Sequence, residues 1–274
     1  MGKRRVGIVG FGKLGQYLAT KVVHHPELEL AFIWNRSAIA QDLQIPEVPV
    51  LGSLDECFQH RPDLIVEVAH PKISLEWGER FLRGADYMVG SPTVFADDPL
   101  RRQLLSLAKE GEHGLYLPQG AMIGLQDLLM AARAGRVAEL HLAMEKTPCS
   151  IHYHGPDLET PLDQITNRQV IYDGPVGPLC QYAPNNVNTM AVATLASGLE
   201  FDQVQAKLVV DPSLKTHIVK VEAIGEGPVD SRFRLSFQKD NPAAKGAVTG
   251  QATYDSFFQS IIRASGQKSG LHFC

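Results

Sequence analysis

The stretch VGIVGFGKLG, residues 6–15, decides the fold, because an apolar strand pattern runs directly into three glycines with the spacing GxGxxG. Gly10 permits a tight turn out of the strand, and Gly12, which has no Cβ atom, lets a pyrophosphate approach the backbone. Gly15 lets the following helix pack closely on the strand. The first turn of that helix offers unpaired N–H groups and a partial positive charge to phosphates. The stretch therefore predicts a dinucleotide-binding βαβ unit.

The first 118 residues alternate strand and helix patterns, which predicts a parallel sheet with crossover helices. Residues 5–9 form a continuous apolar run that is typical of a central buried strand, and residues 12–25 are expected to form a helix. Helices are also expected to begin near residues 53, 71 and 97. Further strands are expected over residues 28–34, 48–51, 64–68, 87–89 and 114–117. We therefore predict an α/β fold with an N-terminal Rossmann domain, a doubly wound parallel sheet, over residues 1–118.

The pattern changes after Pro118. Helices are expected over residues 123–134 and 186–197, the second ended by Gly198. A strand is expected over residues 137–144, and three extended segments follow at 205–210, 217–223 and 233–237. This order predicts an α+β substrate and oligomerisation domain over residues 119–242. Residues 243–274 are expected to supply a C-terminal helix, up to residue 263, and a tail that frays after Gly266.

The composition excludes several classes of protein. The 274 residues carry a net charge of -4, with 44% hydrophobic and 20% charged residues, which is an ordinary globular balance. Without a basic excess, neither nucleic acid nor an anionic membrane is an expected partner. The apolar runs are too short to span a bilayer, and the first residues lack the features of a signal peptide, so a cytoplasmic location is expected. Four scattered cysteines without a CxxC pair predict no metal site.

The end of the second expected strand bears on the choice between NAD and NADP. The residues Asn35, Arg36 and Ser37 stand where an NAD-specific site would place a carboxylate against the ribose 2′-OH. A neutral amide, a cation and a hydroxyl suit a 2′-phosphate instead. We therefore predict that NADP is accepted, over or alongside NAD. The alternative is that Arg36 is only a solvated surface charge.

Later strand ends supply further candidates for cofactor contacts. Ala69 is small enough to pack beside a nicotinamide ribose, and Ser91 follows the fifth strand on the same edge, where open α/β sheets bind their ligands. His70 is expected to cap the next helix rather than to take part in chemistry. The candidate contacts from the first domain are Gly10, Phe11, Gly12, Lys13, Leu14, Gly15, Asn35, Arg36, Ser37, Ala69 and Ser91.

Three segments of the second half carry a resemblance to a known family. They are PQGAMIG at residues 118–124, PNNVN at 184–188 and DPSLKTH at 211–217. With the N-terminal glycines, in this order and with these separations, nearly the whole chain resembles the L-aspartate dehydrogenase family. The resemblance implies a Rossmann domain and an α/β substrate domain whose sheet supports subunit contacts, in a homodimer or homotetramer. It also implies a catalytic His217, with Ala121 and Asn188 near the nicotinamide.

The reaction that the resemblance implies is reversible oxidative deamination of L-aspartate to oxaloacetate and ammonia through iminoaspartate, with NAD or NADP. Hydride leaves the substrate Cα, and water must then attack the imine. Both events need a group that moves protons near neutral pH, and histidine has an ordinary pKa of about 6.5. Asn186 and Asn188 open an expected helix, where capping and ligand contact are compatible.

A small dicarboxylic amino acid also needs cationic or amide partners. The candidates are Asn186, Lys146 and Lys215, with Arg232 and Lys239 as further cations. The HxH pair of His152 and His154 supplies two ligands, too few for a metal site. Two other functions stay open: an NAD(P)-dependent reductase of another small amino or imino acid, and a catalytically silent NAD(P)-sensing protein.

Overall fold

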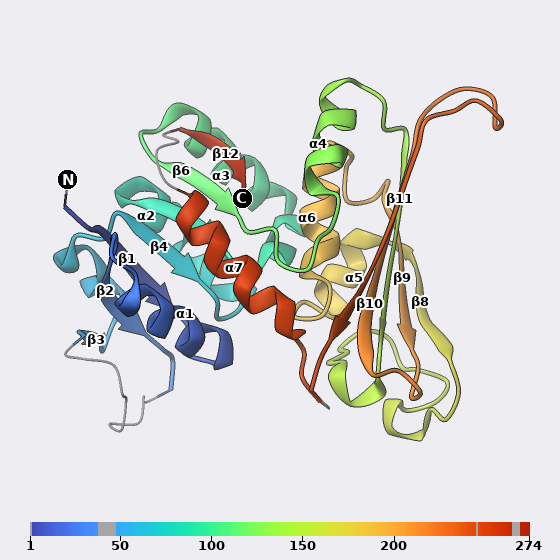
Figure 1. Cartoon of the computed structure of the whole chain (residues 1–274), viewed down its shortest axis with the longest axis horizontal. Coiled ribbons are helices and arrows are strands. Elements are labelled where there is room, and N and C mark those ends of the chain that lie inside the picture. Colours follow the sequence, from blue (N-terminus) through green and yellow to red (C-terminus); the bar gives the residue numbers. More distant parts are fainter. Residues whose placement is uncertain (1, 38–47, 245, 265–268) are drawn as a thin grey trace. The chain divides into compact units, whose positions relative to one another are not determined.

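The computed structural model describes residues 2–37, 48–244, 246–264 and 269–274, and it divides into two compact units (Figure 1). One unit comprises Met1–Pro118 together with Phe257–Cys274, and the other comprises Gln119–Ser256. The division falls inside helix α7 (Gln251–Arg263). The first unit is therefore assembled from two stretches that are far apart in the sequence.

The first unit contains a seven-stranded sheet in the order β12-β6-β5-β4-β1-β2-β3. Its strands are β1 (Arg4–Val9), β2 (Leu28–Trp34), β3 (Val50–Leu51), β4 (Leu64–Glu67), β5 (Asp86–Val89), β6 (Gly114–Leu117) and β12 (Gly270–Phe273). All its strand pairs are parallel. Its helices are α1 (Lys13–His24), α2 (Pro71–Gly84) and α3 (Asp98–Glu110), with short 3₁₀ turns η1 (Leu54–His60) and η2 (Pro92–Ala96). The strand order runs outward in both directions from β1, which confirms the predicted doubly wound Rossmann sheet.

The apolar run of β1 is buried as its sequence predicts. Val6, Ile8 and Val9 have no exposed surface, because the strand is central in the sheet. Leu18 and Val22 lie one helical turn apart on α1 and belong to the same core. The start of the third helix is also explained locally, since the side chain of Asp97 accepts a hydrogen bond from the N–H of Leu100 at 2.9 Å.

The expectation of a frayed tail after Gly266 is wrong. Gly270–Phe273 forms β12, which pairs in parallel with β6, the strand that would otherwise end the sheet, and the N–H of Cys274 donates to the carbonyl of Leu117 at 3.0 Å. An edge strand presents unpaired backbone groups, and this short segment satisfies them. The closing helix α7 also begins later than expected, at Gln251 rather than residue 243. Its end contributes Phe257, Phe258 and Ile261 to the core of the first unit.

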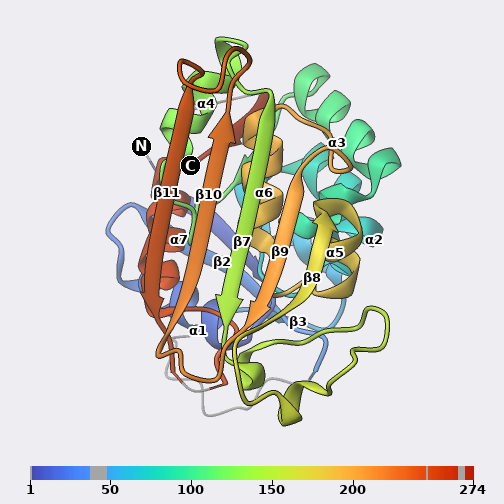
Figure 2. The same ribbon diagram turned by 90° about the vertical axis from the view of Figure 1, so that its right-hand side faces the viewer.

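The second unit contains a five-stranded mixed sheet in the order β11-β10-β7-β9-β8 (Figure 2). The strands β7 and β9 are parallel, and the other pairs are antiparallel. The elements are β7 (Glu139–Lys146), β8 (Gln169–Pro175), β9 (Gln205–Val210), β10 (Thr216–Ile224) and β11 (Arg234–Pro242), with helices α4 (Leu125–Arg133), α5 (Val176–Tyr182) and α6 (Asn188–Ser197) and 3₁₀ turns η3 (Pro148–Ser150) and η4 (Leu162–Gln164). This confirms the predicted α+β character of the second half.

One face of this sheet is buried and the other is more open. Leu140, Leu142 and Met144 alternate with more exposed residues along most of β7, and Val219 and Val221 do the same along β10. In Figure 2 the helix α6 lies behind the sheet, on the buried side. None of the described helices is both long and apolar enough to cross a membrane.

Candidate functional site

The glycine loop leaves room for a ligand at one of its three glycines. Gly10 has a φ of +109°, and a Cβ atom there would lie 2.7 Å from the backbone nitrogen of Ala69. A Cβ atom at Gly15 would collide with the carbonyl oxygen of Gly10. A Cβ atom at Gly12, in contrast, would meet no protein atom within 4 Å. The fold itself therefore needs glycine at positions 10 and 15, whereas Gly12 keeps free space beside the backbone that fits an approaching pyrophosphate.

The helix behind this loop keeps its positive end uncompensated. Gly12 caps α1 without a side-chain hydrogen bond, and the first turn holds no acidic residue. The N–H of Phe11 donates to Oδ1 of Asn35 at 3.0 Å, and Nδ2 of Asn35 donates to the carbonyl of Ser37 at 3.1 Å. Asn35 thus joins the glycine loop to the end of β2. Arg36 and Ser37 follow it and are exposed.

The loops that carry Ala69 and Ser91 share one buried carboxylate. Glu67, the last residue of β4, accepts hydrogen bonds at Oε1 from the N–H groups of Ala69 (2.7 Å) and His70 (2.9 Å) and from the hydroxyl of Ser91 (3.0 Å). Its Oε2 accepts from the N–H of Ser91 at 3.0 Å. The carboxylate therefore fixes both loops at the carboxyl edge of the sheet.

Glu67 was missed by sequence reasoning. It has no exposed surface, and burial raises the pKa of its carboxyl to about 7, although the four hydrogen bonds work in the opposite direction. The one available signal was a single acid inside the apolar run of residues 64–68. The neighbouring His70 behaves as predicted, since its Nδ1 accepts a hydrogen bond from the N–H of Lys72 at 3.2 Å and caps α2.

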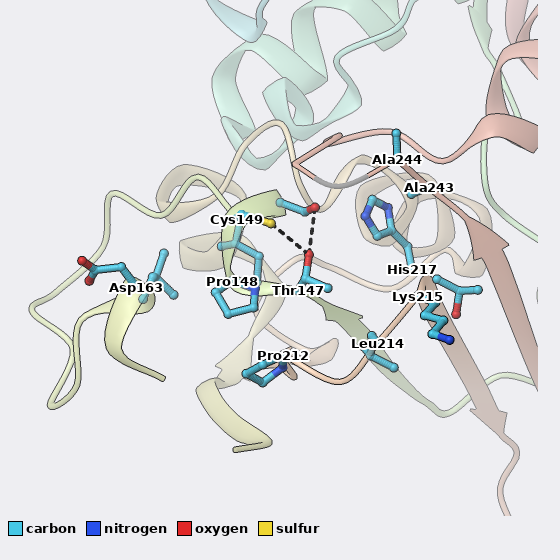
Figure 3. A pocket seen from close by; sticks show the side chains of 14 residues that line it. Thr147, Pro148, Cys149, Asp163, Pro212, Leu214, Lys215, His217, Ala243 and Ala244 are labelled. Atoms are coloured by element: carbon cyan, nitrogen blue, oxygen red, sulfur yellow. Dashed lines mark hydrogen bonds between the residues drawn. The ribbon is translucent and has the colours of Figure 1, made fainter. Parts of the chain in front are cut away.

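A cavity of about 750 Å³ lies within the second unit, where β7 ends and β10 begins (Figure 3). The two strands are antiparallel neighbours, so these two ends meet at one edge of the sheet. The cavity is lined by Thr147, Pro148, Cys149, Ser150, Ile151, Leu162, Asp163, Pro212, Leu214, Lys215, Thr216, His217, Ala243 and Ala244.

His217 is the buried titratable group of this cavity. Its side chain is drawn among the lining residues in Figure 3, only 5% of the residue is exposed, and the imidazole has no hydrogen-bond partner among the described residues. Burial and, to a smaller extent, the charge of Lys146 together lower the pKa of the imidazole to about 4. The ring is therefore neutral at pH 7 and able to accept a proton. Lys215 lines the same cavity and is exposed.

Lys146 ends β7 and is buried, but it is not among the residues that line the cavity. Its Nζ donates to the carbonyl of Val248 at 2.8 Å, and burial lowers the pKa of the amine to about 7. The other two cation candidates also do not line the cavity. Arg232 approaches Glu139 at 3.7 Å, and Lys239 is a partly buried residue of β11.

Asn186 holds the wall of the cavity. Its Oδ1 accepts from the N–H of His152 at 2.9 Å, and its Nδ2 donates to the carbonyl of Ser150 at 2.7 Å. Because the amide is buried and engaged on both sides, it fixes this segment of chain. The expected start of α6 at residue 186 is wrong by two residues: the helix begins at Asn188.

The remaining candidates are spread over the second unit. Ala121 is half-buried in a turn closed by the N–H of Met122, which donates to the carbonyl of Gln119 at 3.0 Å. Asn188 is partly exposed at the start of α6. In the described part of the chain, no three His, Cys, Asp or Glu side chains are grouped to hold a metal ion.

The structure thus assembles two groups of candidates, one in each unit. The glycine loop, Asn35 and the loops of Ala69 and Ser91 meet at the carboxyl edge of the first sheet. His217 and Lys215 line the cavity of the second unit, and Asn186 supports its wall.

Comparison with known proteins agrees with this division. Residues 10–118 match the family model of the homoserine dehydrogenase NAD-binding domain. Residues 127–260 match the model of the aspartate dehydrogenase C-terminal domain. Together, the fold and these matches define an NAD(P)-dependent oxidoreductase with a dinucleotide-binding domain and a separate mixed-sheet domain.

Similar proteins indicate a particular family within this class of oxidoreductases. An aspartate dehydrogenase domain-containing protein from Xenopus tropicalis is 39% identical and covers 99% of this chain and 98% of its own. An L-aspartate dehydrogenase from Methanosarcina acetivorans is 31% identical over 66% of this chain and 67% of its own. The crystal structure of aspartate dehydrogenase from Thermotoga maritima shares the fold, with a TM-score of 0.66 and 22% identity over 95% of this chain and 94% of the other. The chain belongs to the aspartate dehydrogenase family.

Proposed function

We propose that this protein is an NAD(P)-dependent L-aspartate dehydrogenase. It converts L-aspartate, water and the oxidised cofactor into oxaloacetate, ammonium, the reduced cofactor and a proton, and it also runs in reverse. The observation that carries the proposal is the neutral, buried imidazole of His217 in a cavity of the domain that matches aspartate dehydrogenases. The relative from Methanosarcina acetivorans, named L-aspartate dehydrogenase, supports the choice of substrate.

His217 acts as the general base of this reaction. It first accepts a proton from the substrate ammonium, so that the nitrogen lone pair assists as hydride leaves Cα. The bound nicotinamide supplies the hydride acceptor. The imidazole releases that proton to solvent and next takes a proton from the water that attacks the imine carbon. It passes this proton to the amine nitrogen, and as the C–N bond breaks it passes the remaining hydroxyl proton to the departing ammonia, which leaves as ammonium. A pKa of about 4 keeps the base unprotonated over the neutral range.

The cofactor is held by the first unit in this proposal. Gly12 and the start of α1 bind the pyrophosphate, because the space there is open and the helix end is uncompensated. Arg36 and Ser37 would bind the 2′-phosphate of NADP, and the loops fixed by Glu67 would hold the nicotinamide ribose. Phe11, Lys13 and Leu14 complete the loop. The family resemblance implies that Ala121 and Asn188 would contact the nicotinamide.

Lys215 is the candidate partner for a substrate carboxylate, since it is the exposed cation that lines the cavity. A second candidate substrate class is favoured by the apolar part of the same lining, which includes Pro148, Ile151, Leu162 and Leu214. Such walls suit an amino or imino acid with an apolar side chain, in a reduction that uses the same base.

The first test follows the absorbance of NADPH and NADH with oxaloacetate and ammonium, and it compares His217→Ala with the wild-type protein. We expect the variant to lose about 100-fold or more in turnover with little change in cofactor affinity, because only the base is removed. His154→Ala, an exposed histidine near the cavity wall, is the matched control and is expected to retain activity. Michaelis constants for both cofactors test the acceptance of NADP.

Each other outcome has a definite meaning. An unchanged rate in His217→Ala rejects the role of His217. Turnover of apolar keto acids with ammonium, but not of oxaloacetate, selects the second substrate class. Tight cofactor binding without turnover of any keto or imino acid rejects the dehydrogenase and leaves a sensor of the cofactor.

A further inference from the structure

Three buried polar side chains form a row across the second sheet, and we call Asn241, His217 and Lys146 the polar row. Their residues are 2%, 5% and 3% exposed. His217 pairs with Asn241 between β10 and β11. Ile218 pairs with Glu145 between β10 and β7, so the next step of this antiparallel register sets His217 opposite Lys146. The three residues therefore occupy one line on one face of the sheet.

The two outer members of the polar row reach the same short segment of chain. Lys146 donates to the carbonyl of Val248. The amide of Asn241 accepts from the N–H of Ala252 at 3.2 Å and donates to the hydroxyl of Thr253 at 3.1 Å. Residues 248–253 are thus tied to the row on both sides of the imidazole. His217, between them, is the member of the row that lines the cavity.

This arrangement gives Lys146 a different task from binding the substrate. Its amine is engaged with Val248, and Lys146 is absent from the lining of the cavity. A buried ammonium opposite a buried imidazole opposes a second positive charge, because the low local dielectric strengthens their repulsion. Desolvation by the surrounding chain acts in the same direction.

We propose that Lys146 is a positioning residue of the His217 site, which secures residues 248–253 beside the imidazole and, as an ammonium, adds to the effect of burial in keeping that imidazole unprotonated in acidic solution. The proposal deepens the general-base role of His217 and rests on it for its link to turnover. Its electrostatic part concerns the protein alone.

Other titratable groups surround the cavity. Cys149, Asp163 and Lys215 line it, and Lys239 lies on β11 two residues before Asn241. Among the described groups, Lys146 is the one whose charge acts on the pKa of His217, after the larger effect of burial.

The test is an NMR titration of the histidine imidazoles in the full chain without substrate, with the His217 signal assigned from His217→Gln. We expect a midpoint near 4 for the wild-type protein and a rise of about one pH unit in Lys146→Met, which loses the charge. Lys146→Arg keeps the charge and is expected to keep the low midpoint. Lys207→Met is the matched control, because Lys207 is an exposed lysine on β9 that pairs with Asp173 at 3.1 Å.

Several results would overturn the proposal. A wild-type midpoint at or above 6.5 does so without any variant. The proposal is also overturned if the His217 midpoint is unchanged in Lys146→Met. It is overturned as well if the midpoint rises in Lys146→Arg and in Lys207→Met by as much as in Lys146→Met. If Lys146→Met does not fold, Lys146→Gln, which still offers an N–H to Val248, takes its place in the same titration.

The pH profile of kcat/KM separates this proposal from the proposed function. In an active enzyme, the acidic limb of Lys146→Met should shift upward with the NMR midpoint, whereas a merely structural defect would lower kcat/KM without moving the limb. A shifted midpoint in a protein that turns over no amino acid would reject the dehydrogenase and retain the electrostatic coupling. A shifted midpoint with an unmoved limb in an active enzyme would overturn the link between Lys146 and the base.

Discussion

One buried acid of the first unit and two buried bases of the second unit are held in opposite ways. Glu67 in the first unit accepts four hydrogen bonds from neighbouring N–H and O–H groups. In the second unit, the side chain of Lys146 donates one hydrogen bond, to the carbonyl of Val248, and the imidazole of His217 makes none among the described residues. A saturated carboxylate fixes its loops in place, whereas an imidazole without a partner stays available for proton transfer. The comparison fits a structural role for Glu67 at the edge of the sheet and the base role that we propose for His217.

Removing the Glu67 carboxylate should give the largest change in stability. Glu67→Ala leaves three N–H groups and the Ser91 hydroxyl without their acceptor in a buried place. At about 1 kcal/mol for each donor, we expect a loss of about 4 kcal/mol in the free energy of unfolding, measured by urea denaturation. Glu67→Gln, which retains one acceptor oxygen, should lose less. A Glu67→Ala variant as stable as the wild-type protein would show that these four hydrogen bonds do not stabilise the first unit.

Glu67 and Lys146 should change the free energy of unfolding in opposite directions as the pH rises. Burial raises the pKa of Glu67 from 4.5 to about 7, so its contribution to stability falls as pH rises through that range. Burial lowers the pKa of Lys146 from 10.5 to about 7, so its contribution rises between pH 7 and 10.5. Since a tenfold change in proton affinity is about 1.4 kcal/mol, the effect of Glu67 is on the order of 3 kcal/mol. We would measure the free energy of unfolding by urea denaturation at a series of pH values. The fall with rising pH should be absent in Glu67→Gln, and the rise above pH 7 should be absent in Lys146→Met. If both variants keep the pH dependence of the wild-type protein, these assignments are wrong.

An exposed acid of the same unit should give the smallest effect. Glu79 on α2 forms an ion pair with Arg83, one helical turn further on, at 2.7 Å, and both side chains are well exposed to water. We expect Glu79→Ala to change the free energy of unfolding by less than about 0.5 kcal/mol, because solvent screens such pairs. A loss comparable to that of Glu67→Ala would show that burial does not distinguish the two acids.

The first unit was predictable because its signals are local. The glycine spacing and the continuous apolar runs located β1, β2 and β6 to within one residue. Strand β8 and helix α5 were missed, since the sequence QVIYDGP at 169–175 contains a glycine and a proline and forms an edge strand without a clear alternation. Strand β12 was missed because four residues are too few to show a period.

The sequence indicated which types of residue belong to the candidate site, but it did not indicate which residues contact one another. His217 and Asn186 were named from the family resemblance, and their types suit proton transfer and hydrogen bonding. That Asn186 holds Ser150, and that Lys146 reaches Val248 about a hundred residues further along the chain, depends on pairings between distant segments. Such contacts leave no trace in the local pattern of one sequence. Glu67 was missed for a related reason, since its partners come from two different loops.

The strand β12 also constrains how the protein is made. During synthesis on a ribosome, the first six strands of the Rossmann sheet emerge long before Gly270–Phe273, and the whole mixed-sheet unit is translated in between. The edge of β6 therefore stays uncovered until Gly270–Phe273 has been translated, and an unpaired edge is a surface on which nascent chains associate. The dinucleotide domain can reach its final form only after the domain that follows it has left the ribosome.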